Sequence, residues 1–204
     1  MSKRKINTVV AYAQIKDADI LAPLYPPERY IEVKECKNDK ARLEKYLVWK
    51  LLEKVVGDTL NLDFANVKFT KTANGKWICP DFYFSLSHTD GLVCVAVSEQ
   101  PIGVDAELVR DINAELKGKI LTERELIILS ELSPCEQNRY LLDSWIRKES
   151  IFKKTGGDKL LPNRTEASEH FTVLKTLSVS GREYVVSVAL DCDEKIEFKY
   201  MEDI

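Results

Sequence analysis

The segment GVDAE at residues 103–107 predicts a β-strand that carries two acidic side chains on one face. Side chains alternate across a strand, so residues two apart, here Asp105 and Glu107, project to the same side. Acidic side chains on a strand usually face water, and this pair alone would fit that ordinary role. Its significance depends on a second acidic segment further along the chain.

That second segment, WIRKESIFK at residues 145–153, indicates a helix. A carboxylate on an apolar stripe of a helix is costly unless a cation or hydrogen bonds meet it. If the strand packs against the helix, the carboxylates of both segments converge beside Lys148 and Lys153. A hard divalent metal bound to a phosphate substrate needs such an arrangement. The carboxylate in question is that of Glu149. It lies on the same side of the predicted helix as the apolar residues Leu141, Trp145 and Phe152.

The whole chain has the composition of an ordinary soluble globular protein, with 45% apolar and 31% charged residues. Its 204 residues fit one large domain or two small domains of about 100 residues each. The formal net charge of −3 does not indicate bulk attraction to nucleic acid. We therefore expect no nucleic-acid partner, and we expect any anion-binding site to be local.

The five cysteines are scattered without any CxxC spacing, which fits reduced thiols in a cytoplasmic protein better than disulfides or a zinc site. The basic N-terminus, residues 1–6, is not followed by an apolar run long enough for a signal peptide. No segment has the ~20 consecutive apolar residues of a membrane span. We expect a cytoplasmic protein without a membrane partner.

Periodicity and turn residues predict strand, helix and then strands over the first hundred residues. Residues 6–15 alternate as a strand, and the prolines from Pro23 to Pro27 predict a break. Asn38 or Asp39 can cap a helix that ends before Gly57. The other expected elements are strands at 67–70 and 92–98 and a loop at 72–90.

Two capping boxes predict helices in the second hundred residues. Thr122 and Glu125 begin a short helix, and Ser133 and Glu136 begin a long one that runs to Gly156. Each half of the chain thus follows the order strand, helix, strands, and we predict an α+β fold. The last expected strands are 171–178, 184–190 and 196–200. The predicted division is into two similar α+β halves with a pseudo-twofold relation, residues 1–100 and 101–204.

A third motif, FSLSHT at residues 84–89, precedes the acidic segments and completes a series. The order F-x-x-S-H-[ST], G-V-D-x-E and W-x-x-K-E-[SA]-x-x-K-x-x-G resembles the 4′-phosphopantetheinyl transferases of the Sfp type. Each motif is weak alone, but their number, order and spacing together are specific. The resemblance covers the chain from about Asn38 to Leu161.

The resemblance implies a monomer of two similar halves with the active site in the cleft between them. It implies a holo-acyl-carrier-protein synthase type of reaction, in which the 4′-phosphopantetheine arm of coenzyme A moves to a serine of an apo acyl or peptidyl carrier protein. Mg²⁺, or Mn²⁺ in its place, is required, and adenosine 3′,5′-bisphosphate leaves. The implied metal ligands are Asp105, Glu107 and Glu149. The implied contacts with coenzyme A are Arg42, Lys76, Ser87, His88, Lys148 and Lys153.

The chemistry of these residue types agrees with the implied reaction. Phosphoryl-type transfer requires mainly positioning and charge neutralisation, and Mg²⁺ prefers carboxylate and phosphate oxygens. Glu149 can accept the serine proton, directly or through water. Lys153 can stabilise the pyrophosphate as negative charge moves to the leaving group. Glu107 completes the predicted catalytic set.

Three departures from the family pattern concern the nucleotide contacts. Ser85 stands where the family usually has Asn, and Trp77 stands where a Gly-Lys-Pro step has proline. Upstream of the first helix, Arg29 is the nearest basic candidate. These changes leave the predicted metal site untouched.

Simpler interpretations are available for each motif. Glu149 and Lys153 could form a surface ion pair, and His88 could be a hydrogen-bonded turn residue. Lys76 and Arg42 could be solvated. Three further basic residues form no compact patch along the sequence and are interpreted as surface residues: Lys40, Lys45 and Lys50.

Two other function classes stay open. A metal-dependent nuclease or phosphohydrolase also clusters acidic residues with lysine, but the common nuclease pattern has a lysine where this chain has Val109. A non-catalytic module that binds coenzyme A or a carrier protein would be expected to have lost a metal carboxylate, and all three are present.

Overall fold

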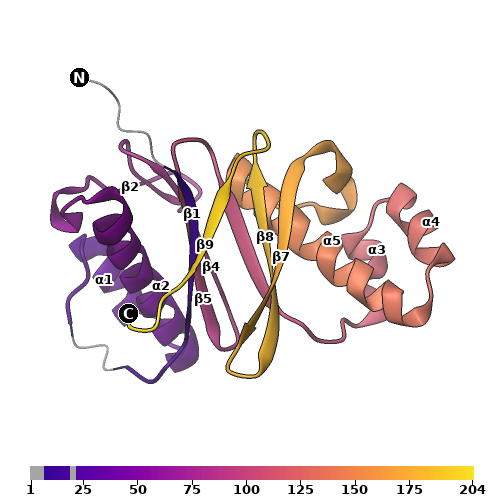
Figure 1. Cartoon of the computed structure of the whole chain (residues 1–204), viewed down its shortest axis with the longest axis horizontal. Helices are drawn as coiled ribbons and strands as arrows, with labels where there is room; N and C mark the ends of the chain where they lie inside the picture. Colours follow the sequence, from indigo (N-terminus) through magenta and orange to yellow (C-terminus); the bar gives the residue numbers. More distant parts are fainter. Residues whose placement is uncertain (1–6, 19–21) are drawn as a thin grey trace.

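The computed structural model describes residues 7–18 and 22–204. Its helices and sheets form separate layers, which confirms the predicted α+β class (Figure 1). The basic residues 1–6 lie outside the described residues, and they include the first residue of the strand predicted at 6–15. The expected absence of a signal peptide concerns this segment and stays a prediction.

The described part of the chain begins with one strand and ends with three. A π-helical turn, η1 (Val56–Leu60), continues the second helix.

None of the helices in the described ranges is long and apolar enough to cross a membrane. The helices are α1 (Pro27–Lys34), α2 (Asp39–Val55), α3 (Lys117–Ile120), α4 (Glu123–Glu131) and α5 (Pro134–Thr155). The strands are β1 (Thr8–Gln14), β2 (Thr70–Lys71), β3 (Trp77–Ile78), β4 (Tyr83–Thr89), β5 (Leu92–Ser98), β6 (Gly103–Leu108), β7 (Phe171–Val179), β8 (Arg182–Leu190) and β9 (Ile196–Tyr200).

Two sheets lie side by side between two groups of helices (Figure 1). The first sheet has the strand order β4-β5-β1-β9 and the second has the order β6-β8-β7. Apolar side chains from both sheets, such as Val10 and Ala96 of the first and Val104 and Val186 of the second, form one cluster. α2 packs against the far side of the first sheet, and α5 packs against the second.

β1 and β5 are buried on both faces. Val9 and Ala11 of β1 join the cluster beneath α2, whereas Val10 joins the cluster shared by the two sheets. β5 pairs with β1 and places Val97 opposite Val9. Because both faces are covered, these strands are almost wholly apolar. That composition explains why the strand at 92–98 could be predicted, and the prediction is confirmed.

Both predicted capping boxes are confirmed. Thr122 and Glu125 exchange side-chain and backbone hydrogen bonds at the start of α4. Ser133 and Glu136 form the second box at the start of α5. α5 ends at Gly156, whose φ of 70° lies in the left-handed region that glycine adopts without a steric penalty.

The predicted start of the second helix is also confirmed, because Asn38 accepts a hydrogen bond from the backbone N–H of Ala41. Its end differs slightly from the prediction. The α-helix stops at Val55, but the chain continues helically as η1, so Gly57 lies within the π-helical turn.

Two segments predicted to be irregular contain regular structure. The loop predicted at 72–90 contains β3 and β4, and β4 pairs with β5 over its whole length. α1 begins at Pro27, where the prolines predicted a break, because proline fits the first turn of a helix. Of the strand predicted at 67–70, only Thr70 belongs to a strand, β2.

The last strand returns to the first sheet. β9 pairs in parallel with β1, although β7 and β8, which precede it, belong to the second sheet. The C-terminal end of the chain therefore stabilises the sheet that the N-terminal part builds. The division into similar halves at 1–100 and 101–204 stays a prediction.

Candidate active site

β6 and α5 pack against each other, which is the condition under which the two acidic segments come together. Gly103 permits this approach, because a Cβ atom there would clash with the carbonyl oxygen of Ser150 and lie 2.5 Å from the backbone nitrogen of Lys154. The hydroxyls of Ser150 and Ser187 are 2.8 Å apart and join α5 to β8. The glycine of the GVDAE segment thus allows the acidic residues of strand and helix to come close.

Asp105 projects from β6 toward α5 and is 6% exposed. Its Oδ1 accepts a hydrogen bond from Nζ of Lys153 at 2.6 Å and another from Oγ of Ser87 at 2.9 Å. Nζ of Lys153 also donates to Oγ of Ser87 at 3.1 Å. Asp105 is therefore held by one residue of α5 and one of β4.

Glu107 and Glu149 lie close enough to Asp105 for their charges to interact. Burial, and then the charge of Asp105, raises the pKa of Glu107, although Oε2 of Glu107 accepts a hydrogen bond from Thr89 at 3.1 Å. Burial and the charge of Asp105 likewise raise the pKa of Glu149. We call Asp105, Glu107 and Glu149 the carboxylate cluster.

The carboxylate cluster fits Mg²⁺ in donor type and in charge. Carboxylate oxygens are ligands that Mg²⁺ prefers, and a cation would relieve the repulsion that raises two of the pKa values. Within the described part of the chain, no group of three or more His, Cys, Asp or Glu side chains is already arranged to hold a metal ion. The cation that contacts Asp105 is the Lys153 ammonium. The metal assignment of the three residues stays a prediction.

Lys148 does not lie beside the carboxylate cluster, and its predicted placement is wrong. Its side chain is 0% exposed and forms an ion pair with Glu125 of α4. It also donates to the carbonyl oxygens of Ile120 at 2.8 Å and Pro162 at 2.9 Å. Neighbouring residues of a helix point about 100° apart, so Lys148 faces α3 and α4 while Glu149 faces β6.

Ser87 and His88 lie on opposite sides of β4. Ser87 is buried against Asp105, whereas Nδ1 of His88 lies 3.2 Å from Oε2 of Glu44 on α2. Burial, and then the positive charges of Lys153 and Lys45, lowers the pKa of His88. His88 therefore lies between the carboxylate cluster and a group of basic residues that α1 and α2 provide.

That group lines a cavity of about 420 Å³, which we call the basic pocket. Arg29 of α1 is buried over the ring of Trp49, 4.9 Å from its centroid, and burial lowers the pKa of Arg29 to about 10. Its Nη2 donates to the carbonyl oxygen of Lys45 at 2.9 Å. Its Nε is buried without a hydrogen-bond partner among the described residues. The pocket is lined by Arg29, Glu32, Glu35, Cys36, Lys45, Gly75 and Trp77.

Arg42, the residue matched to the family's basic position in this helix, does not line the basic pocket. Its guanidinium donates to the carbonyl oxygen of Cys36 at 3.0 and 2.6 Å and pairs with Asp39 at 2.8 Å. It stabilises the start of α2. Lys45, interpreted from the sequence as a surface residue, lines the pocket instead.

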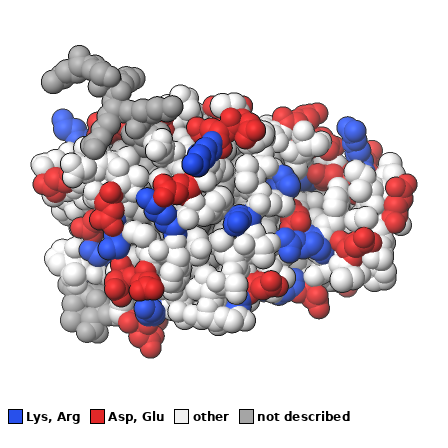
Figure 2. Space-filling model, in the orientation of Figure 1, with Lys and Arg blue, Asp and Glu red and all other residues white. Residues whose placement is uncertain are grey.

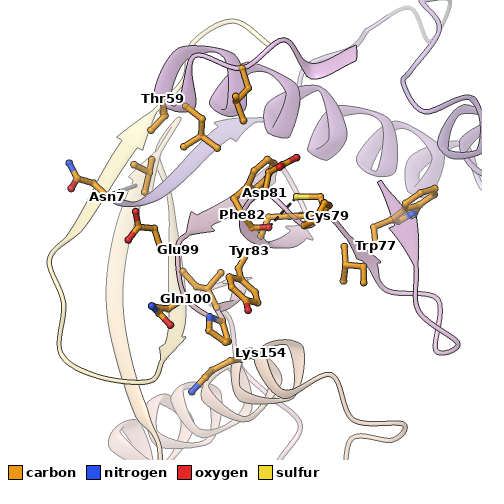
Figure 3. A pocket seen from close by; sticks show the side chains of 18 of the residues that line it. Asn7, Thr59, Trp77, Cys79, Asp81, Phe82, Tyr83, Glu99, Gln100 and Lys154 are labelled. Carbon is orange, nitrogen blue, oxygen red and sulfur yellow. Dashed lines mark hydrogen bonds between the residues drawn. The ribbon is translucent and has the colours of Figure 1, made fainter. Parts of the chain in front are cut away.

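Lys76 links the turn before β3 to the end of α5, because its Nζ donates to the carbonyl oxygen of Lys153. Burial lowers the pKa of Lys76. Lys76 also lines a second cavity of about 1240 Å³, around which Asn7, Tyr83, Glu99 and Lys154 are arranged (Figure 3). That cavity contains no residue of the carboxylate cluster.

Figure 2 shows the distribution of charged side chains on one face of the molecule. On the face drawn in Figure 2, acidic and basic side chains are interspersed, and neither sign covers a large area. The basic pocket and the carboxylate cluster therefore owe their properties to buried, closely spaced groups.

Comparison with known proteins gives a family match over the second half of the chain. The sequence model of the 4′-phosphopantetheinyl transferase superfamily matches residues 101–193, a range that contains the carboxylate cluster and Lys153. The resemblance to the 4′-phosphopantetheinyl transferase superfamily is confirmed. The segment with Lys76 and His88 lies outside that match.

Curated relatives carry the same family name. The chain is 30% identical over 135 residues to the 4′-phosphopantetheinyl transferase gsp of Aneurinibacillus migulanus, which covers 66% of this chain and 54% of that protein. It is 30% identical over 115 residues to the 4′-phosphopantetheinyl transferase Sfp of Bacillus subtilis, with 55% and 51% covered. The chain therefore spans about half the length of the 4′-phosphopantetheinyl transferases that it matches.

Proposed function

We propose that this protein is a 4′-phosphopantetheinyl transferase, which moves the 4′-phosphopantetheine arm of coenzyme A to a serine hydroxyl of an apo acyl or peptidyl carrier protein. The observation that carries the proposal is the convergence of Asp105, Glu107 and Glu149 at the contact of β6 with α5, beside Lys153. The residue types and their spacing match the motifs of the 4′-phosphopantetheinyl transferase superfamily, to which the resemblance is confirmed.

The carboxylate cluster would hold the divalent metal, Mg²⁺ or Mn²⁺ in its place. When bound, the metal supplies charge neutralisation at the pyrophosphate of coenzyme A. The raised pKa values of Glu107 and Glu149 support this assignment, because burial and then the negative charge of Asp105 raise both, and a cation would offset the second effect. The absence of a His/Cys group in the sequence motif favours a metal that prefers oxygen over zinc.

Glu149 is the proposed general base. The serine oxygen forms a bond to the phosphorus that carries the pantetheine arm, and the bond from that phosphorus to the bridging oxygen of the pyrophosphate breaks. The serine proton moves to Glu149, directly or through water, and adenosine 3′,5′-bisphosphate leaves with the bridging oxygen. Glu149 is suited to this role by its place on the face of α5 that meets β6, where its charge interacts with those of Asp105 and Lys153.

Lys153 is the proposed electrostatic partner of the leaving group. Its ammonium donates hydrogen bonds to Asp105 and Ser87, and its side chain is only partly buried. A lysine ammonium is a compact charge on a flexible stem, so it can shift from Asp105 to a phosphate oxygen as negative charge develops there. Glu107 supports the metal and the base as the third member of the carboxylate cluster.

The basic pocket is the proposed site of the adenosine 3′-phosphate. Arg29 and Lys45 line it, and His88 lies within electrostatic range of both. Lys76 is not among the lining residues, although its neighbours Gly75 and Trp77 are, and its ammonium donates to the carbonyl oxygen of Lys153. A phosphate there would satisfy buried donors such as Nε of Arg29 and raise the lowered pKa of His88. This proposal replaces Arg42, whose guanidinium is engaged at the start of α2, with Lys45.

The same proposal includes the arrangement and setting of the enzyme. Two similar halves, residues 1–100 and 101–204, would place the site between them, and a monomer in the cytoplasm would act on carrier proteins there. The site residues come from β4 on one side and from β6 and α5 on the other, which supports a site between two parts of the chain.

The experiment incubates the protein with coenzyme A, Mg²⁺ and an apo carrier protein and measures the carrier by intact mass spectrometry. A mass gain of one phosphopantetheine arm, absent with the Asp105→Asn variant, is the expected result. Tight binding of coenzyme A without any mass gain would indicate a binding module. Hydrolysis of nucleic acid under the same conditions, without transfer, would indicate a nuclease.

A further inference from the structure

β4 and β6 are edge strands of different sheets, and serine hydroxyls connect them. Oγ of Ser85 accepts a hydrogen bond from the backbone N–H of Val104 at 3.0 Å. Oγ of Ser87 accepts one from the backbone N–H of Ala106 at 3.1 Å. Both serines are buried, with 4% and 3% of their surface exposed. Side-chain hydroxyls therefore satisfy backbone donors of β6 that a paired strand would otherwise satisfy.

Only one of the two serines also contacts the carboxylate cluster. Oγ of Ser87 donates its proton to Oδ1 of Asp105 at 2.9 Å and accepts a hydrogen bond from Nζ of Lys153 at 3.1 Å. With the bond from Ala106, the hydroxyl makes one donated and two accepted hydrogen bonds, which is its full capacity. Ser87 has no proton left to donate to a substrate phosphate.

We propose that Ser87 is a positioning residue that fixes the Asp105 carboxylate and the Lys153 ammonium relative to β6, and that it does not contact coenzyme A. The proposal rests on the proposed function. It departs from the role that the family resemblance implies for Ser87, which is a contact near the adenosine 3′-phosphate. The neighbouring His88, on the opposite side of β4, keeps that role.

The physical consequence is a carboxylate that is held in one orientation before the metal arrives. The N–H of Ala106 ties Ser87 to the backbone just after Asp105, so the hydroxyl and the carboxylate cannot move independently. Groups that orient metal-ligating carboxylates typically change metal affinity or activity by about 10–100-fold when they are removed. Loss of the Ser87 hydroxyl should therefore weaken metal binding and leave recognition of the nucleotide unchanged.

The chain offers a matched control. Ser85→Ala and Ser87→Ala each remove a buried hydroxyl that accepts a hydrogen bond from β6, but only Ser87→Ala removes a contact with Asp105. Mn²⁺ binding to each purified protein, without substrate, is measured by titration calorimetry. Coenzyme A and dephospho-coenzyme A are titrated into the same proteins. The unfolding temperature of each variant reports the loss that the two substitutions share.

The expected result is an Mn²⁺ affinity about tenfold weaker for Ser87→Ala and within about threefold of wild type for Ser85→Ala. Preference for coenzyme A over dephospho-coenzyme A should be the same in both variants. Equal Mn²⁺ affinities in the two variants would show that Ser87 has only a structural role and does not position the metal ligand. Loss of the preference in Ser87→Ala alone would establish a substrate contact. Either outcome, or a wild-type protein that does not bind Mn²⁺, overturns the proposal.

A second variant covers the case in which Ser87→Ala does not fold. Ser87→Cys keeps the size of the side chain but replaces the hydroxyl with a weakly hydrogen-bonding thiol, and it should weaken Mn²⁺ binding in the same direction. Wild-type Mn²⁺ affinity in Ser87→Cys would contradict the positioning role. Failure of the proposed transferase activity is recognised separately, because a wild-type protein can bind Mn²⁺ and still transfer nothing to a carrier.

Discussion

The carboxylate cluster and the basic pocket lie on either side of His88 and differ in the charged groups that they bring together. In the carboxylate cluster, burial and neighbouring negative charge raise the pKa values of Glu107 and Glu149. At the basic pocket, burial lowers the pKa of Arg29 to about 10, and burial with neighbouring positive charge lowers that of His88. In the carboxylate cluster, like charges therefore lie close together, and a cation would relieve part of their repulsion. The basic pocket instead pairs part of its positive charge internally, because Arg29 forms an ion pair with Glu32 at 3.1 Å, and Glu35 also lines the pocket.

The difference between the regions lies in their ligands and in their proposed tasks. A cation at the carboxylate cluster would touch the reacting phosphates, whereas a phosphate in the basic pocket would hold the far end of the substrate. Substitutions in the first region should therefore lower the rate of the chemical step, and substitutions in the second should weaken binding.

The largest effect is expected for Asp105→Ala, which removes a metal ligand and the ion-pair partner of Lys153. Transfer to a carrier protein should fall below detection while the far-UV circular dichroism spectrum stays that of wild type. Excess chelator should abolish the activity of the wild-type protein in the same assay. Full activity of a folded Asp105→Ala protein, or undiminished turnover in chelator, would remove the carboxylate cluster from the mechanism.

The next effect separates two lysines of α5. Lys148→Met should destabilise the fold by about 3–5 kcal/mol, because it leaves Glu125 buried without its ion-pair partner. Lys153→Met should cost less stability, since Lys153 is partly exposed, but it should lower kcat. Urea unfolding and steady-state kinetics of both variants make the comparison. Equal losses of stability would show that the two lysines have the same structural role.

A smaller effect is expected in the basic pocket. Lys45→Ala should reduce the preference for coenzyme A over dephospho-coenzyme A by about 1–3 kcal/mol, the range for a charge-assisted hydrogen bond. Arg42→Ala, three residues away on the same helix, is the control and should keep the preference. Titration calorimetry with coenzyme A and with dephospho-coenzyme A measures this preference in each variant. A preference lost in Arg42→Ala and kept in Lys45→Ala would restore the assignment made from the sequence.

The smallest effect is a pH-dependent gain of stability in the metal-free protein. Because the pKa of Glu107 is raised in the folded state above its ordinary value of 4.5, ionisation of this group opposes folding. Glu107→Gln should therefore differ least from wild type below pH 4.5, where the carboxyl is mostly protonated in both states. It should become the more stable protein as the pH rises from 4.5 to above the raised pKa. Thermal unfolding with chelator from pH 4 to 8 tests the sign, and a gain confined to low pH would contradict it.

The sequence predicted the acidic region better than the basic one, for a physical reason. Asp105 and Glu107 share a strand face, and Glu149 lies on a helical stripe, so local periodicity alone indicates where they point. The capping boxes at Thr122 and Ser133 are equally local signals, and both were confirmed. The predicted placement of Lys148 was wrong because Lys148 directly precedes Glu149 in the helix, and adjacent helix residues point about 100° apart.

The basic pocket depends on contacts that no local pattern contains. α1, α2 and the turn before β3 each contribute to it, and α1 begins at Pro27, the last residue of the predicted break. Lys45 lies at the pocket because α1 packs beside α2, a contact that the sequence pattern of α2 does not contain. β4 was predicted as a loop because the burial of Ser85 and Ser87 depends on backbone donors of β6, more than fifteen residues away along the chain.

Steady-state kinetics of Glu149→Gln beside Lys45→Ala, with coenzyme A varied at saturating carrier protein, tests the separation of the two regions most directly. Glu149→Gln should lower kcat by at least ~10²-fold, the usual scale for a lost general base, with little change in KM. Lys45→Ala should raise the KM for coenzyme A and leave kcat within a factor of about three of wild type. A Glu149→Gln enzyme with wild-type kcat, or a Lys45→Ala enzyme that loses kcat without a change in KM, would contradict the account.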